Sequence, residues 1–190
     1  ALVTGANGFI GSKVVECLLN SGYARVRCLA RPTGNTERLD DVIARNARPG
    51  CQAETLRGNL LNRDDCGRAV DGVSVAFPLA AGGGRASAGC CVQSGLTARA
   101  LVGGGVAAGT LRRCVNVSSF AVYSNLHMRR RALLDETTPL EDDFQARCDA
   151  YGFGKLKQEQ IVDAYHRRHG IPHVTLRPGA VFGPGKRALS

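Results

Sequence analysis

Tryptophan is absent from the sequence, methionine occurs once, and aromatic residues make up only 5% of the chain. No apolar run approaches the ~20 residues that a membrane-spanning helix needs, so we predict no membrane partner. None of the eight cysteines form a C-x-x-C pair, which excludes the common zinc and thioredoxin motifs. A disulfide framework belongs to small secreted chains without a sufficient core, whereas 190 residues, 44% of them hydrophobic, can build one. We therefore expect reduced thiols and a cytoplasmic location.

Positive charge exceeds negative charge, with 25 lysines and arginines against 16 acidic residues and a net charge of +9. A basic surface can bind nucleic acid. However, the arginine clusters are short, lie far apart and are not interleaved with aromatic residues: 112–113, 129–131 and 167–168. We interpret them as solvated surface and expect no nucleic-acid partner. The charge is also compatible with a polyanionic small molecule, such as a dinucleotide phosphate or a sugar nucleotide.

The histidines His166, His169 and His173 raise the question of a metal site. Gly170 and Pro172 end the helix between them, so the side chains need not converge. Cationic groups are favourable at the C-terminus of any helix. We therefore predict no metal site.

Strand-like and helix-like stretches alternate along the chain, which is typical of a parallel sheet covered by helices. The predicted strands are 1–4, 25–30, 53–57, 73–79, 114–118 and 173–177. The predicted helices are 10–20, 36–45, a short helix capped by Asn62, 93–108 and 151–169. Helix 93–108 is the weakest, because each glycine of 103–105 costs about 1 kcal/mol relative to alanine, and a broken helix is the alternative. The predicted fold class is α/β, with a doubly wound parallel sheet and helices on both faces.

A glycine-rich turn, TGANGFIG over residues 4–11, joins the first predicted strand to the first predicted helix. The first glycine allows a tight turn, the second lets a pyrophosphate approach the backbone, and the third lets the helix pack against the strand. The helix N-terminus adds N–H groups and a partial positive charge. The first gap is one residue longer than in the G-x-G-x-x-G fingerprint, and a structural turn without a ligand is the alternative. We predict a dinucleotide site that includes Gly5, Asn7, Gly8, Phe9, Ile10 and Gly11.

The end of the second predicted strand, about 20 residues past Gly11, should lie beside the adenosine ribose. An acidic residue there binds the 2′-hydroxyl of NAD, whereas an arginine accommodates the 2′-phosphate of NADP. The sequence has Arg31 at this place and Arg27 nearby, with no carboxylate before Glu37. We therefore predict that NADP is favoured over NAD. The alternative is that Arg31 is only a surface charge and does not contact the cofactor.

A serine, a tyrosine and a lysine follow in an order that suits proton transfer beside a nicotinamide. Ser118 and Ser119 end the fifth predicted strand, and the carboxyl ends of parallel strands face the ligand crevice. Tyr151 and Lys155 open the next helix, where positions i and i+4 share one face. A free tyrosine has a pKa of about 10, which a nearby ammonium lowers. Such a phenol can exchange a proton with the substrate while the nicotinamide exchanges a hydride.

Together, these motifs resemble the extended short-chain dehydrogenase/reductase family, in its NAD-dependent epimerase/dehydratase branch. The resemblance covers almost all of the chain, and its other segments are SSFAVY at 118–123, YGFGK at 151–155 and RPGAVFGPG at 177–185. It implies a Rossmann-type dinucleotide-binding domain over 1–182. Over 183–190 it implies the start of a substrate-binding region that is largely absent. We also expect a few residues to be missing before Ala1.

The resemblance also implies roles for individual residues. Ser119, four residues before Tyr123, would be the catalytic serine, and Tyr151 would be the acid/base. Lys155 would bind the nicotinamide ribose and tune Tyr151. The expected cofactor contacts beyond the glycine turn are Arg31, Asn59, Leu60, Leu79, Ala80, Ala81, Tyr151, Lys155, Pro178 and Val181. Asn59 stands where the family usually has an acid and Pro78 where it commonly has histidine, which concerns affinity more than chemistry.

The leading hypothesis is an NAD(P)-dependent epimerase or dehydratase that acts on a sugar nucleotide by hydride transfer, with a tyrosine acid/base. An NADPH-dependent carbonyl or 3-beta-hydroxysteroid-type reductase is the alternative among enzymes. A cofactor-sensing protein without catalysis is the alternative outside them, and the complete Ser–Tyr–Lys set argues against it. A homodimer of the full-length protein stays open.

Overall fold

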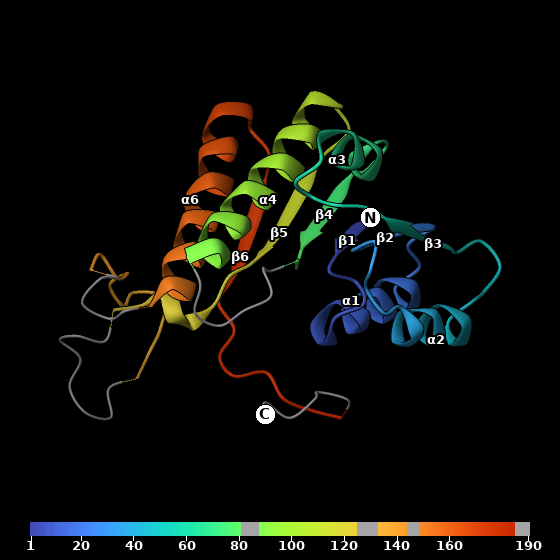
Figure 1. Cartoon of the computed structure of the whole chain (residues 1–190), viewed down its shortest axis with the longest axis horizontal. Coiled ribbons are helices and arrows are strands. Elements are labelled where there is room, and N and C mark those ends of the chain that lie inside the picture. The colour runs from blue at the N-terminus through green and yellow to red at the C-terminus, as the bar shows by residue number, and fades with distance from the viewer. Residues whose placement is uncertain (81–87, 125–132, 144–148, 185–190) are drawn as a thin grey trace.

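The chain folds into a six-stranded sheet of parallel strands, flanked by helices (Figure 1). The computed structural model describes residues 1–80, 88–124, 133–143 and 149–184, and for 88–94 it describes the backbone alone. The strand order is β3-β2-β1-β4-β5-β6. The strands are β1 (Leu2–Thr4), β2 (Arg25–Ala30), β3 (Gln52–Arg57), β4 (Val75–Pro78), β5 (Arg113–Val117) and β6 (His173–Leu176).

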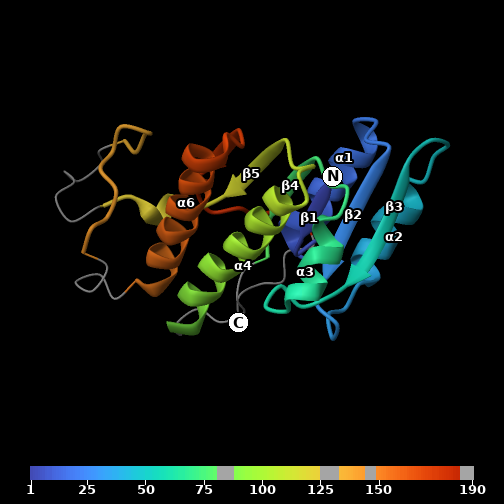
Figure 2. The ribbon, with the colours of Figure 1, turned by 90° about the horizontal axis from the view of Figure 1, so that it is seen from above.

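The helices form two layers, one on each face of the sheet. They are α1 (Phe9–Asn20), α2 (Glu37–Arg45), α3 (Arg63–Val70), α4 (Ala88–Ala107) and α6 (Ala150–His169), with a 3-10 turn η1 (Phe120–Val122) after β5. Figure 2 shows α3, α4 and α6 on the side of the sheet opposite α1 and α2. Because successive residues of a strand point to opposite faces, Leu2 packs in the core under α3, α4 and α6, and Val3 packs in the core under α1 and α2. The predicted doubly wound α/β fold of Rossmann type is confirmed. Within the described residues, no helix is both long and apolar enough to span a membrane.

Helix α4 runs without a break through its three consecutive glycines, so the predicted helix is present and the alternative of a broken helix is wrong. A Cβ on Gly103 would lie 2.7 Å from the hydroxyl oxygen of Tyr165, on α6. A Cβ on Gly105 would lie 2.8 Å from Cδ2 and 3.1 Å from Cβ of the buried Leu111. Tertiary packing therefore favours glycine at both positions, because a Cβ would displace the Tyr165 hydroxyl at 103 and would crowd the buried Leu111 at 105.

We expect Gly105→Ala to lower the free energy of unfolding by roughly 1–3 kcal/mol, since the added methyl group overpacks the site beside Leu111. Gly67→Ala in α3 is the matched control, because no atom lies within 4 Å of a Cβ at Gly67. That change should leave stability unchanged or raise it by up to about 1 kcal/mol. Urea unfolding measures both variants, and equal effects would show that packing does not explain the glycine at 105.

The cysteines that the structure describes are free thiols, at positions 17, 28, 51, 66 and 114. Burial raises the pKa of Cys114 to about 12, and burial followed by the nearby Glu54 raises that of Cys28 to about 12. Such thiols carry almost no thiolate at neutral pH and are poor nucleophiles. Cys90, Cys91 and Cys148 lie outside the described side chains.

Candidate functional site

The turn between β1 and α1 lies where the strand order reverses, with β2 on one side of β1 and β4 on the other. Gly5 has a φ of +64°, which favours glycine, and a Cβ there would lie 3.0 Å from the backbone nitrogen of Ala80. The N–H of Gly5 donates to the carbonyl oxygen of Leu29 (3.1 Å). A Cβ on Gly11 would overlap the carbonyl oxygen of Gly5. The tight turn and the close helix packing that the glycines predict are therefore both present.

Helix α1 begins at this turn without a capping side chain. Its N-cap, Gly8, has no side chain to accept a hydrogen bond, and no acidic residue lies in the first helical turn. The first N–H groups of a helix have no partner within it, and the helix dipole adds a partial positive charge. This end of α1 therefore offers donors and positive potential to an anion such as a pyrophosphate.

A cleft of about 300 Å³ opens beside the turn, at the carboxyl ends of β1, β2 and β4. It is lined by Gly5, Asn7, Gly8, Leu29, Ala30, Arg31, Gly58, Asn59, Leu60, Leu61, Leu79, Ala80 and Thr97. Half of the sixteen predicted cofactor residues therefore meet in one cleft. The predicted residues Phe9, Ile10, Gly11, Tyr151, Lys155, Pro178 and Val181 do not line it. Ala81 lies outside the described residues.

Leu29, Ala30, Gly58, Leu61 and Thr97 line the cleft without having been predicted as site residues. Leu29, Ala30 and Gly58 could have been found, because they stand at or just after the ends of neighbouring parallel strands. Thr97 lies within α4, and no local motif signals that it reaches the cleft. Its place depends on how α4 packs.

Arg31 lies at the edge of this cleft, directly after β2. Its side chain is exposed and has no hydrogen bond or ion pair within the part of the chain that the structure describes. Arg27 differs: its guanidinium binds Glu54 and donates to the carbonyl oxygens of Arg68, Ala69 and Asp71 at the end of α3. Arg27 therefore gives no support for NADP, because its side chain binds Glu54 and the end of α3.

The loop after β2 is held from two sides. Arg57, the last residue of β3, donates to the carbonyl oxygens of Pro32 (2.9 Å) and Gly34 (3.1 Å) and to Oγ1 of Thr36 (3.2 Å). Asn7, in the glycine turn, donates through Nδ2 to the carbonyl oxygen of Asn35 (2.9 Å). The loop next to Arg31 is therefore fixed to the sheet and to the turn.

Asn59 lines the cleft, and its side chain forms a hydrogen bond within its own turn. Its Oδ1 accepts from the N–H of Leu61 (3.0 Å), which shapes the turn before α3. Its own N–H donates to Asp65 (2.7 Å), and this bond, followed by one from Arg68, lowers the pKa of the Asp65 carboxyl. Asn59 thus helps to form the cleft wall.

Ser119 follows β5, at the same edge of the sheet as the cleft. Its Oγ accepts from the N–H of Ala121 (3.2 Å) and so caps η1. The N–H of Phe120 donates to the carbonyl oxygen of Pro178 (3.1 Å), which ties this segment to the end of β6. Beside it, the hydroxyl of Ser118 is buried and has no hydrogen-bond partner among the described residues.

Tyr151 and Lys155 lie on the first turns of α6, which packs against η1. Tyr151 is 45% exposed, and no residue that the structure describes hydrogen-bonds its hydroxyl. Lys155 is only 6% exposed; its Nζ donates to the carbonyl oxygen of Val117 (2.8 Å) and to Oε1 of Gln158 (3.2 Å). Burial lowers the pKa of Lys155 to about 8, against a smaller opposing effect of Glu159. Ser119, Tyr151 and Lys155 therefore flank one corner of the sheet without bonding to each other.

The sequence analysis did not predict one ion pair near these residues. Arg177, just after β6, makes a bidentate bond to the carboxylate of Glu159 on α6 (3.0 and 2.8 Å). Its third contact is to the hydroxyl oxygen of Tyr123 (3.1 Å), and its guanidinium lies 4.8 Å from the Tyr123 ring centroid. Because Tyr123 follows Ser119 through η1, the cluster connects α6, β6 and the serine segment.

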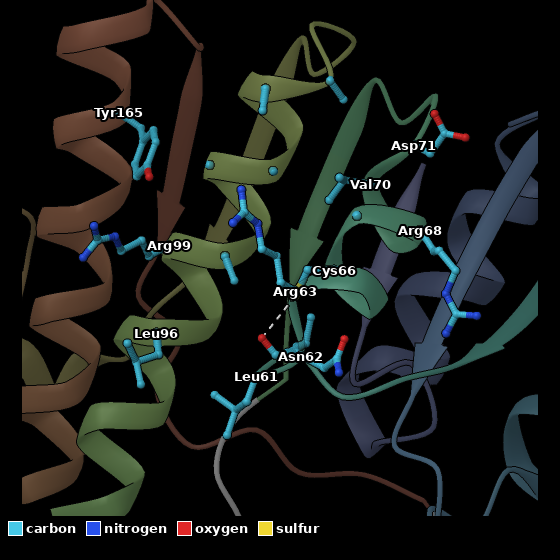
Figure 3. A pocket seen from close by; sticks show the side chains of 17 residues that line it. Leu61, Asn62, Arg63, Cys66, Arg68, Val70, Asp71, Leu96, Arg99 and Tyr165 are labelled. Atoms are coloured by element: carbon cyan, nitrogen blue, oxygen red, sulfur yellow. Dashed lines mark hydrogen bonds between the residues drawn. The ribbon is translucent and has the colours of Figure 1, made fainter.

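A larger groove of about 1090 Å³ lies between α3, α4 and α6 (Figure 3). It shares only Leu60 and Leu61 with the cleft. Of the predicted site residues it contains Leu60 alone, and it lacks Ser119, Tyr151 and Lys155. Size alone therefore does not identify the site. Among the described residues, no group of histidines, cysteines and carboxylates could hold a metal ion.

Comparison with curated proteins gives relatives of about twice this length. The chain is 30% identical to dihydroflavonol 4-reductase of Zea mays, over 96% of this chain and 53% of that protein. It is also 30% identical to 3 beta-hydroxysteroid dehydrogenase/Delta 5-->4-isomerase of Mycobacterium tuberculosis, over 99% of this chain and 48% of that protein. The chain thus spans about half the length of the curated relatives it matches.

Solved structures agree with the fold. The dTDP-glucose 4,6-dehydratase of Streptomyces venezuelae, with NAD and TYD bound, has a TM-score of 0.80 and 28% identity over 96% of this chain and 56% of that chain. The UDP-glucose 4-epimerase of Thermus thermophilus, in complex with NAD, has a TM-score of 0.71 and 25% identity over 97% and 56%. The model of one family of NAD-dependent enzymes matches residues 1–190, the whole chain. The chain therefore belongs to the NAD dependent epimerase/dehydratase family.

Proposed function

We propose that this chain holds a nicotinamide dinucleotide, NADP in preference to NAD, in the cleft beside the glycine turn. We further propose that the full-length protein is an epimerase- or dehydratase-type oxidoreductase that acts on a sugar nucleotide. The observation that carries the proposal is the common edge of the sheet: the cleft and the Ser119, Tyr151 and Lys155 positions all lie at the carboxyl ends of the strands. The division into a cofactor domain over 1–182 and a substrate region from 183 belongs to the same proposal, as does a cytoplasmic location.

The residues present fit such a cofactor. The uncapped start of α1 suits the pyrophosphate, and Arg31 suits a 2′-phosphate. When bound, a nicotinamide supplies hydride transfer to or from carbon. The Tyr151 hydroxyl, exposed on α6, moves a proton to or from the substrate oxygen, and the Ser119 hydroxyl hydrogen-bonds that oxygen. The Lys155 ammonium provides the positive charge that stabilises a phenolate.

Two reaction classes remain, and one measurement separates them. The dTDP-glucose dehydratase and UDP-glucose epimerase structures support a sugar nucleotide, and the net charge of +9 favours a polyanionic ligand. The dihydroflavonol and hydroxysteroid relatives, together with Arg31, support an NADPH-dependent reductase as the second candidate. An epimerase recycles its cofactor, whereas a reductase consumes it. We expect UDP-glucose or dTDP-glucose to be converted in the presence of NADP⁺ with no net formation of NADPH, because the hydride taken from the sugar is returned to it.

The NADP preference predicts a selective effect at Arg31. We expect Arg31→Ala to weaken NADPH binding about 10- to 100-fold, because a charge-assisted contact to the 2′-phosphate is lost. NADH binding should change by less than about twofold, because NADH lacks that phosphate. Arg25→Ala is the matched control, since Arg25 is equally exposed at the opposite end of β2. Cofactor fluorescence titration of the wild type and the two variants gives the six dissociation constants, and a wild-type preference for NADH would contradict the assignment.

A further inference from the structure

A chain of polar side chains runs beneath α6, where apolar packing is the usual arrangement. Lys155 donates to Oε1 of Gln158 (3.2 Å), and Nε2 of Gln158 donates to Oδ1 of Asn116 on β5 (2.6 Å). Nδ2 of Asn116 donates to Oγ1 of Thr175 on β6 (3.2 Å). Asn116 is 0% exposed and Gln158 is 3% exposed. Amides buried this deeply destabilise a fold unless they are hydrogen-bonded, so the chain is maintained as a unit.

The Lys155 ammonium fixes the direction of these hydrogen bonds, because it can only donate. The oxygen of Gln158 accepts from it, so the nitrogen of Gln158 points to Oδ1 of Asn116. The nitrogen of Asn116 then donates to the hydroxyl of Thr175, a group that can donate or accept. A flipped Gln158 would place an N–H₂ group against the ammonium, donor against donor. Gln158 is thus held in one orientation between Lys155 and Asn116.

The partners of the Lys155 ammonium are neutral. One is the carbonyl oxygen of Val117 and the other is the amide oxygen of Gln158. Glu159 is the nearby carboxylate, and it is bound at both oxygens by Arg177, whose other contact is the Tyr123 hydroxyl. An ammonium has three N–H donors, so one of them is not used by the described residues. The charge and one donor of Lys155 are thereby left for a ligand and for Tyr151.

We propose that Gln158 is a positioning residue for Lys155: locked by Asn116, its neutral side-chain oxygen fixes the ammonium without cancelling its charge. The role assigned to Lys155 rests on the proposed function, whereas the contact itself does not. Burial lowers the pKa of Lys155, and a nearby carboxylate raises it, so the charge of the acceptor at position 158 sets how Lys155 titrates. A carboxylate in the same place would hold the ammonium equally well but would neutralise it.

The test uses the full-length protein and compares two substitutions with the same charge and the same helical spacing. Gln158→Glu places a carboxylate beside Lys155. Gln160→Glu is the control, because it places a carboxylate beside Lys157 instead. The Nζ of Lys157 donates to Oε1 of Gln160 (3.0 Å) on the exposed face of α6. NMR titration of the lysine side chains follows the pKa, with the Lys155 signal assigned by its loss in Lys155→Arg. Within residues 1–190 the lysines are 13, 155, 157 and 186, so this part of the protein adds few signals.

We expect Gln158→Glu to raise the titration midpoint of Lys155 by about one pH unit or more, and Gln160→Glu to leave it unchanged. NADPH affinity should fall at least about fivefold in Gln158→Glu and stay within twofold in Gln160→Glu. If the glutamate disturbs folding, Gln158→Met removes the acceptor at similar volume; it should lower the midpoint and weaken NADPH binding. Equal Lys155 midpoints in the two glutamate variants would overturn the proposal, and so would a shifted midpoint with unchanged NADPH affinity.

The same data separate this inference from the proposed function. If the wild-type protein binds neither NADPH nor NADH, the proposed function fails, although the Lys155 midpoint can still shift in Gln158→Glu. If the wild type binds NADPH and the Gln158 variants bind it equally well, the proposed function stands and the positioning role is overturned.

Discussion

Replacing Tyr151 with phenylalanine should lower turnover at least about 100-fold while leaving NADPH affinity within twofold, since positioned acid–base groups contribute typically ~10²–10⁴-fold. The change removes only the hydroxyl. That hydroxyl is on a half-exposed ring and has no hydrogen-bond partner among the described residues, so its loss leaves no buried group unpaired. We therefore expect stability to stay within about 0.5 kcal/mol. Chromatography of the products from UDP-glucose and dTDP-glucose measures turnover, and cofactor fluorescence measures binding.

Tyr165→Phe is the control for this experiment, because Tyr165 lies on the same helix but lines the larger groove. It should retain wild-type turnover. Full turnover in Tyr151→Phe would show that the tyrosine does not transfer the proton. If cellular function also survived that change, a cofactor-sensing protein would become the better explanation of the fold.

The buried ion pair should produce the largest effect on stability. We expect Arg177→Met to lower the free energy of unfolding by about 3 kcal/mol, because it leaves the Glu159 carboxylate, 10% exposed, without its cation. The double substitution Glu159→Leu with Arg177→Met should recover most of that loss, since no charge is then left buried. Urea unfolding of the single and double variants measures both effects.

Arg167→Met provides the comparison, because Arg167 pairs with Asp163 on the same helix but at the surface. Exposed pairs contribute little, so this change should cost less than about 0.5 kcal/mol. A similar small loss in Arg177→Met would mean that water screens the Glu159 pair as well. The cluster would then not hold the serine segment against α6.

The alternating elements of the fold could be read from the sequence because each carries its own local signal. The first four residues of strand β2 alternate between accessible arginines and buried apolar residues, and its last three are buried. Asn62 accepts from the N–H groups of Asp64 and Asp65 as an N-cap does. Helix α4 was harder to predict, since the penalty of its glycines is local. The reason for the glycines lies in the packing of Tyr165, far along the chain, and of Leu111, just beyond the end of the helix. Element ends differ by a few residues; β4, for example, is Val75–Pro78 within the predicted 73–79.

The site was predictable where chemistry follows from spacing, as in the glycine turn. It was not predictable where partners come from distant elements. Gln158 and Asn116 are polar residues that a hydrophobic pattern assigns to the surface, yet both are buried and bonded to each other. Arg177 and Glu159 likewise meet only after β6 packs beside α6. Their catalytic neighbours Ser119, Tyr151 and Lys155 remain predictions that the proposed variants test.

The hydrogen bonds of Arg57 to the loop after β2 affect the rate at which a ligand can bind. Three donor bonds from one guanidinium and a fourth from Asn7 hold this loop in a single conformation. Its conformational entropy is therefore lost during folding and not during ligand capture. A ligand that contacts the loop meets a rigid surface, and its association need not wait for a rearrangement.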